Sequence, residues 1–292
     1  MPFAPHLSLL CPVCRQPFEP SGAHPQAGKR LVCPAGHSFD AARQGYFNFL
    51  VGKGTAFEAD SAAMVEARHS FLAAGHYLPL ATAVAAAVVR VLPATGAAVL
   101  DSGTGTGQYL RVLLDQAAAT APAAYGLDIS KYALRRAARL NPEAMNLVWD
   151  IWQPLPLATD SVDAVTVVFA PRNPAEFARV LRPAGRLVVV TPRSGHLAEL
   201  AARTGMLAIE EGKDARLAAA MASHFDLESS SDIDIPLSLT VSQATDLAFM
   251  GPAGHHLGRE AIAGRLAGSR EPVTAEARLK LLVFTPAQTP AE

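Results

Sequence analysis

Residues 97–107, Ala97-Ala98-Val99-Leu100-Asp101-Ser102-Gly103-Thr104-Gly105-Thr106-Gly107, pass from an apolar run through an acid into a loop in which glycine alternates with small polar residues. The next residues, 108–114, show helical spacing of their apolar side chains. Glycine has no Cβ, so the backbone of such a loop can approach a nucleotide-like ligand, to which the following helix N-terminus offers N–H groups. The stretch therefore predicts a strand, a glycine loop and a helix. Its candidate cofactor-binding residues are Asp101, Gly103, Gly105, Thr106 and Gly107.

A second unit of the same kind follows. Residues 124–127 form a short apolar strand that ends in Asp128, about twenty residues beyond the last glycine, where an acid can bind both hydroxyls of a ribose. An alternative role for Asp128 is to cap the helix that begins near Ser130 and Lys131.

Strands and helices then continue to alternate. Strands are expected at 146–149, ending in Asp150, and at 162–169, 185–190, 233–240 and 279–284. Helices are expected at 80–92, at 174–181 after the N-cap candidate Asn173, and at 196–203 and 216–225. This order predicts an α/β fold with a doubly wound, Rossmann-like sheet of about seven strands and an antiparallel pair at its end.

All three cysteines lie near the N-terminus, in the arrangement Cys11-x2-Cys14-x18-Cys33-x3-His37. Thiolate and imidazole ligands at this spacing predict a tetrahedral zinc site, and four protein ligands leave no open position, so the zinc would be structural. The alternative is a redox pair with an incidental third thiol, although no thioredoxin-like strand precedes it.

Composition indicates a globular protein of one or two domains, because 50% of the 292 residues are hydrophobic and 17% are charged. The net charge of −1 argues against a strongly basic nucleic-acid binder. No apolar run is long enough for a membrane span and no signal peptide is recognisable, so a cytoplasmic location is expected. We expect a zinc-ribbon domain at 1–40, a helical connector at 41–92 that contributes to the cofactor site, and a catalytic domain at 93–292.

The loop at 99–107, the acids at 128 and 150, and the phrase Val-Leu-Arg-Pro-Ala-Gly-Arg-Leu-Val at 180–188 together resemble the class I S-adenosylmethionine-dependent methyltransferases. A dehydrogenase would share the first two features only. With the zinc ligands added, the whole chain resembles the bacterial 23S rRNA guanine-N1 methyltransferases. The matching phrases are Cys11-Pro-Val-Cys14, Cys33-Pro-Ala-Gly-His37-Ser-Phe-Asp40, Arg43-Gln-Gly-Tyr46-Phe-Asn48, Asp60-Ser61-Ala-Ala-Met64, Ala67-Arg68, Phe71-Leu72 and Ala74-Gly75-His76-Tyr77. The later phrases at 169–174 and 191–200 are similar to the branch that protects macrolide producers from tylosin- and mycinamicin-type drugs.

This resemblance implies S-adenosylmethionine as methyl donor, zinc on the four N-terminal ligands, 23S rRNA as substrate, macrolide resistance as a consequence, and a tendency to form homodimers. It also implies that Tyr77, Gly105, Thr106 and His196 contact the methyl donor, beside Asp128 and Asp150. Taken alone, Tyr77 and His196 would be read as a packed aromatic and a surface histidine. The sequence departs from common family wording at Ser102 and Thr104, two small residues in the glycine loop, which puts the cofactor affinity in question.

Methyl transfer to guanine N1 needs in-line positioning, a proton acceptor, and stabilisation of charge that develops towards O6. Arg172, directly after the fourth strand, is the candidate for charge stabilisation, and Asp60 or solvent is the candidate proton acceptor. An equally good interpretation of Arg172 is structural, as a residue that pairs with or caps the helix at Pro174.

N1 lies on the Watson–Crick edge, so the target base must be unpaired or extruded. The basic residues expected to contact RNA phosphates are Arg15, Lys29, Arg30, Arg43 and Lys53. The aromatic residues Phe18, Phe39, Tyr46 and Phe47 are either a base-stacking surface or the core of the ribbon. Two other functions fit parts of the chain: a small-molecule methyltransferase that modifies an antibiotic, and a zinc-ribbon RNA-binding module without catalysis.

Overall fold

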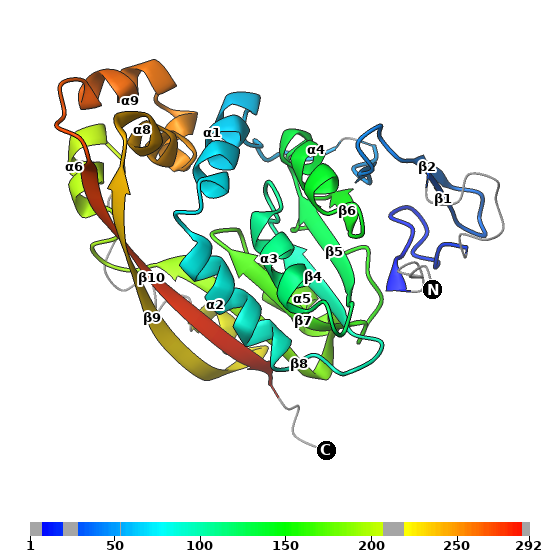
Figure 1. Cartoon of the computed structure of the whole chain (residues 1–292). Helices are drawn as coiled ribbons and strands as arrows, with labels where there is room; N and C mark the ends of the chain where they lie inside the picture. Colours follow the sequence, from blue (N-terminus) through cyan, green and yellow to red (C-terminus); the bar gives the residue numbers. More distant parts are fainter. Residues whose placement is uncertain (1–7, 20–28, 53, 207–218, 288–292) are drawn as a thin grey trace.

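The structure is a computed structural model that describes residues 8–19, 29–52, 54–206 and 219–287. An eight-stranded sheet forms its centre (Figure 1). In order across the sheet the strands are β3 (Phe47–Asn48), β6 (Met145–Val148), β5 (Ala123–Asp128), β4 (Ala98–Ser102), β7 (Val162–Val168), β8 (Leu181–Pro192), β10 (Val273–Pro286) and β9 (Phe225–Leu239). The doubly wound α/β fold and the antiparallel pair at its end, β9 with β10, are confirmed.

The strands from β3 to β8 are parallel, and β10 runs antiparallel to both of its neighbours. All seven residues of β7 are buried, as expected for a central strand covered on both faces. The chain leaves β4 towards β5 on one side, and later returns to β7 on the other. Strand order therefore reverses at β4, and ligands of open α/β sheets bind in the crevice at the carboxyl ends of such strands.

Helices pack against one face of the sheet. They are α1 (Ala62–Ala73), α2 (Leu78–Val89), α3 (Gln108–Gln116), α8 (Val241–Phe249) and α9 (Arg259–Leu266), and their apolar residues form one buried cluster with Val99 and Val188 of the strands. The described residues also form the helices α4 (Lys131–Leu140), α5 (Pro174–Val180) and α6 (Ala198–Thr204) and the 3-10 turn η2 (Pro252–His255). Among the described residues no single helix is long and apolar enough to cross a membrane, and the bent pair of α1 and α2, at 83°, meets that test only when taken together.

The N-terminal segment packs on the opposite face of the sheet. Its strands β1 (Arg30–Val32) and β2 (Ser38–Asp40) form a small antiparallel sheet beside β6 and α4 (Figure 1). Leu9, Phe18 and Cys33 share a buried cluster with Leu100 and Leu147 of the central strands. On this face of the sheet the ribbon therefore contributes core residues, as helices do on the opposite face.

The structure differs from the sequence-based expectation at both ends of the sheet. Eight strands are present where about seven were expected, because the two-residue β3 from the connector pairs in parallel with β6. Strand β9 begins at Phe225, inside the helix expected at 216–225, of which residues 216–218 lie outside the described part. Residues 226–232 of β9 are exposed and, apart from Leu227, polar, so their pattern does not indicate a strand, yet this stretch pairs with β10. Strand β10 likewise begins at Val273 rather than 279.

Candidate zinc centre and cofactor site

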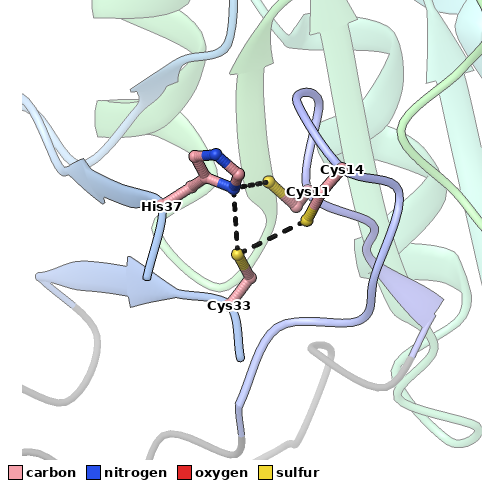
Figure 2. A group of neighbouring side chains, drawn as sticks. All are labelled: Cys11, Cys14, Cys33 and His37. Atoms are coloured by element: carbon pink, nitrogen blue, oxygen red, sulfur yellow. Dashed lines mark hydrogen bonds between the residues drawn. The ribbon is translucent and has the colours of Figure 1, made fainter. Parts of the chain in front are cut away.

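The four predicted metal ligands converge in space (Figure 2). The Sγ atom of Cys14 lies 3.6 Å from that of Cys33, and Nδ1 of His37 lies 3.4 Å from Cys33 Sγ and 3.7 Å from Cys11 Sγ. Zn–S bonds of about 2.3 Å and Zn–N bonds of about 2.0 Å in a tetrahedron require ligand separations of about 3.5–3.8 Å. The site therefore fits a zinc ion, and its sulfur separation is far too long for a disulfide.

Two tight turns place these ligands. Arg15 N–H donates to the carbonyl of Cys11 at 2.9 Å, and Gly36 N–H donates to that of Cys33 at 2.8 Å. Each turn contains a left-handed residue, Arg15 at φ 62° and Gly36 at φ 82°. Backbone N–H groups thus organise both knuckles without using the ligand atoms.

The ribbon's aromatic residues form its core. The ring centroids of Phe18, Phe39 and Phe49 lie 4.9–5.9 Å from one another. Tyr46 and Phe47 are also buried. Of the two roles considered for Phe18, Phe39, Tyr46 and Phe47, the structure supports packing, and base stacking must be sought elsewhere.

The glycine loop follows β4 and is fixed to the end of β5, because the N–H groups of Gly103 and Thr104 both donate to the Leu127 carbonyl, at 2.8 and 2.9 Å. Gly103, Gly105 and Gly107 all have positive φ. A Cβ on Gly103 would lie 2.2 Å from Ala170 Cβ, and one on Gly107 would lie 2.9 Å from Ala137 Cα in α4. A Cβ on Gly105 would meet only Arg68 Cδ, at 3.6 Å. The first and third glycines therefore permit close packing of the protein, and Gly105 presents the open side of the loop.

Asp128 receives two backbone hydrogen bonds. Its Oδ2 accepts from Gly105 N–H at 2.9 Å and its Oδ1 accepts from Ser130 N–H at 2.7 Å. Ser130 itself caps α4, since its side chain accepts from Ala133 N–H, so the alternative in which Asp128 is the N-cap is wrong. Burial raises the pKa of Asp128 to about 6, against the lowering effect of these two N–H groups. Asp128 is thus an acid at the crevice whose remaining lone pairs can accept ribose hydroxyls.

A hollow of about 250 Å³ adjoins this acid. Its lining includes Leu50 beside β3, Asp60, and Ile129, which directly follows Asp128. The connector between the ribbon and α1 therefore lines one side of this hollow, and its contribution to the cofactor site stays a prediction.

Asp150 follows β6 and is 5% exposed. Its Oδ2 accepts from the Thr55 hydroxyl at 2.9 Å, and its Oδ1 accepts from Trp152 N–H at 3.0 Å. Asp150 therefore joins the connector to the loop after β6, in addition to any contact with a cofactor.

Three aromatic rings lie close together near the carboxyl end of β7. The Phe169 ring lies 6.3 Å from the Tyr77 ring and 6.5 Å from the His196 ring. It therefore lies between the two residues predicted to contact the methyl donor, a role for Phe169 that the sequence did not indicate. Phe169 has a left-handed backbone at φ 56°, a strain that tends to occur at functional sites, and its side chain is 38% exposed. Burial lowers the pKa of His196 to about 4. Because its Nδ1 lies 3.1 Å from the Arg278 carbonyl, Nδ1 carries the proton and Nε2 is free to accept a hydrogen bond.

Several buried polar atoms near the end of β4 have no hydrogen-bond partner among the described residues. They include Oδ2 of Asp101, the Ser102 hydroxyl and the Tyr109 hydroxyl. The other oxygen of Asp101 accepts from the Thr166 hydroxyl at 2.7 Å, and burial raises the pKa of this acid. Buried polar groups are normally satisfied. Their orphaned atoms, beside a glycine with an open face, therefore fit a bound polar cofactor.

Thr106 uses its hydroxyl internally, since that group donates to the Gln108 side chain. Gln108 also contacts Nδ1 of His69 at 3.1 Å. Any contact of Thr106 with the methyl donor would therefore be made by its backbone.

The candidate catalytic residues lie in different surroundings. Nε of Arg172 is buried without a hydrogen-bond partner in the described part, and burial lowers the pKa of its guanidinium. Asp60 forms an ion pair with Arg68 at 2.5 Å and lies 3.5 Å from Nε2 of His255. Arg68 borders Gly105 and links Asp60 to the Met250 carbonyl; it belongs to one of the phrases shared with the family, but the sequence assigned it no role.

The basic residues expected to meet RNA are divided. Lys29 and Arg43 are exposed, and the exposed Arg30 pairs with Asp40 at 2.6 Å. Arg15 donates to the Pro154 carbonyl at 3.1 Å, while Lys53 lies outside the described residues.

Known proteins contain both the zinc ribbon and the glycine-loop domain in one chain. Residues 9–51 match a family model described as "RlmA, N-terminal", and residues 100–189 match one described as "Methyltransferase domain". The chain is 44% identical to the "Putative 23S rRNA (guanine-N(1)-)-methyltransferase" of Micromonospora griseorubida, across 97% of this chain and 98% of the relative. It is 40% identical to the "23S rRNA (guanine(748)-N(1))-methyltransferase" of Streptomyces fradiae, across 89% and 90%. The crystal structure of the YcgJ protein from Bacillus subtilis has the same fold, with a TM-score of 0.51 at 17% identity, over 70% of this chain and 99% of that one.

Proposed function

We propose, since the chain belongs to the 23S rRNA (guanine-N1)-methyltransferase family, that it transfers a methyl group from S-adenosylmethionine to N1 of a guanine in 23S rRNA. The observation that carries the proposal is the presence in one chain of a four-ligand zinc ribbon and a glycine loop. In that loop the N–H group of Gly105, the glycine with an open side, donates a hydrogen bond to Asp128. A small-molecule methyltransferase would explain the loop but would leave the ribbon without a role.

The chain's own residues would hold the cofactor at the carboxyl edge of the sheet. Asp128 would accept the ribose hydroxyls, Gly105 would let the backbone approach, and Asp101 with Tyr109 would satisfy polar groups of the amino acid end. The bound sulfonium supplies an electrophilic methyl group, so the enzyme's main task is to orient the acceptor nitrogen.

The acceptor would enter beside Phe169 and Arg172, which follow β7. Nε of Arg172, which has no hydrogen-bond partner among the residues that the structure describes, can stabilise negative charge developing towards O6 of the guanine. Asp60 remains our candidate proton acceptor together with solvent, although its ion pair with Arg68 must rearrange before it can take a proton.

We further propose that the enzyme acts in the cytoplasm, that it forms homodimers, and that its modification protects ribosomes from tylosin- and mycinamicin-type macrolides. The domain division at residues 40 and 92 is also a proposal, and the burial of the ribbon on the sheet means that the parts share a core. Resistance is tested by drug susceptibility of a sensitive host that expresses the chain.

The activity is tested by incubating the protein with S-adenosylmethionine and unmodified 23S rRNA, followed by primer extension. Methylation of N1 blocks the pairing edge, so we expect one new reverse-transcriptase stop that needs both protein and methyl donor. Label found in a small-molecule fraction, with no new stop on the RNA, would move the assignment to an antibiotic-tailoring enzyme.

A further inference from the structure

Two large aromatic side chains project from the surface next to the candidate site. Phe57 is 54% exposed and Trp152 is 52% exposed. Their ring centroids lie 6.3 Å apart and their planes are tilted by 37°, so each ring keeps much of its area free of the other. Burying an aromatic ring is favourable, so two neighbouring rings that stay exposed give up that free energy. Adjacent exposed apolar side chains of this kind tend to mark an interaction site.

One buried carboxylate fixes both rings. Asp150 accepts from the Thr55 hydroxyl and from Trp152 N–H, and the Thr55 hydroxyl in turn accepts from Phe57 N–H at 3.2 Å. The two segments are far apart in sequence, and this side chain holds them in one arrangement. The pair is therefore a built feature of the surface rather than two unrelated loop residues.

The loop that carries Trp152 contacts both the ribbon and the segment after β7, where the acceptor is proposed to enter. Nδ2 of Asn173, next to Arg172, donates to the Ile151 carbonyl at 2.9 Å. On the other side, Arg15 of the first zinc knuckle donates to the Pro154 carbonyl at 3.1 Å. The loop that carries Trp152 thus contacts both parts of the proposed RNA-binding surface, through the Arg15 guanidinium on the ribbon side and through Asn173, the neighbour of Arg172, on the other.

We propose that Phe57 and Trp152 form a stacking site for an unpaired base of the substrate RNA, adjacent to the methylated guanine. The inference rests on the proposed function. Extruding a guanine exposes the faces of its neighbours, and aromatic side chains are the usual partners for unstacked bases because every base has a π-face. Phe18, Tyr46 and Phe47 are buried and Phe39 is partly buried against the core, so the exposed pair takes the stacking role that was considered for those four residues.

The test compares variants of the full-length, zinc-loaded protein. Trp152→Ala and Phe57→Leu remove the aromatic surface, Trp152→Phe restores it, and Leu227→Ala is a control of equal exposure, 51%, on the strand β9 at the other end of the sheet. We expect Trp152→Ala to weaken binding of unmodified 23S rRNA by about 5- to 100-fold, the range for one lost stacked base. Trp152→Phe should recover most of this loss, Phe57→Leu should show a smaller one, and S-adenosylmethionine affinity should stay within about twofold throughout.

Fluorescence gives an independent readout. The chain has two tryptophans, of which Trp149 is 4% exposed, so acrylamide quenching reports mainly on Trp152. Bound RNA should protect Trp152 from acrylamide.

The possible failures are distinguishable. If the wild-type protein neither binds nor methylates the RNA, the proposed function is wrong. If it does both but Trp152→Ala binds RNA as the wild type does, the stacking site is refuted. If Trp152→Ala loses affinity for S-adenosylmethionine as well as for RNA, the stacking site is also refuted, and the rings belong to the adenine of the cofactor.

Discussion

Substituting alanine at Gly105 and at Gly107 separates the ligand-facing residue of the glycine loop from the packing residue. Both positions have positive φ, 56° and 88°, so each alanine should cost about 1–2 kcal/mol of backbone strain. At Gly105 the new methyl group meets only Arg68 Cδ at 3.6 Å, an ordinary contact. Strain alone should therefore set its effect on stability, a fall in melting temperature of about 2–6 °C.

At Gly107 the same strain is joined by overlap. The new Cβ would lie 2.6 Å from Nδ2 of Asn141 and 2.9 Å from Ala137 Cα, and that Asn141 nitrogen donates to the Gly107 carbonyl at 2.9 Å. Overpacking against a helix backbone adds about 1–3 kcal/mol. The total of about 2–5 kcal/mol predicts a fall in melting temperature of about 4–15 °C.

Cofactor binding should show the opposite order. The Gly105→Ala methyl group fills the open face of the loop, so calorimetry should find at least a tenfold loss of S-adenosylmethionine affinity, about 1.4 kcal/mol. Gly107→Ala, assayed well below its melting temperature, should bind more tightly than Gly105→Ala. Wild-type affinity in Gly105→Ala, or equal melting temperatures for the two variants, would refute this account of the loop.

Three further changes test the acid, the metal and the basic surface. Asp128→Asn should weaken S-adenosylmethionine binding by about 1–3 kcal/mol in calorimetry, the range for a buried hydrogen-bond partner. Because burial raises the pKa of Asp128 to about 6 and the ionised form accepts the ribose hydroxyls, wild-type affinity should fall as pH drops through about 6, and this dependence should vanish in Asp128→Asn. Cys33→Ser should lower the zinc content measured by metal analysis. Hydrogen exchange should increase in the ribbon and in residues 150–158, while residues 103–107 stay protected and the cofactor still binds. Replacing Lys29 and Arg30 with alanine should reduce the salt dependence of RNA binding by up to about two phosphate contacts in filter binding, with cofactor affinity unchanged; the pairing of Arg30 with Asp40 makes Lys29 the larger contributor.

The parts of the fold that could be predicted from sequence are those specified by local pattern. The apolar runs before Asp101 and Asp128 form β4 and β5, and the continuous apolar stretch at 162–168 forms the buried β7. Asn173 caps α5 as expected, since its side chain accepts from Glu176 N–H. A capping box at Thr240 and Gln243 starts α8, and this signal is also local to the sequence.

The remaining features depend on pairing between distant segments. The exposed and mostly polar stretch 226–232 of β9 is a strand because β10 supplies its hydrogen bonds, and β3 is too short for its two residues to form a pattern. The site behaves in the same way. Glycine spacing locates the loop, but it does not reveal that Gly103 and Gly107 serve packing. The pairing of Phe57 with Trp152 required a side chain, Asp150, that bridges two segments far apart in the sequence.

The same segment that carries Asp150 is also where the zinc ribbon meets the catalytic sheet. Leu9 pairs with Leu157, Leu10 N–H donates to the Pro156 carbonyl at 2.9 Å, and Arg15 reaches the carbonyl of Pro154. A ribbon held only by a flexible tether could bind RNA but could not fix the distance between that contact and the methyl group. Because zinc would close the knuckle that contacts this loop, we expect the metal to fix the ribbon, and with it the proposed RNA contacts, relative to the crevice.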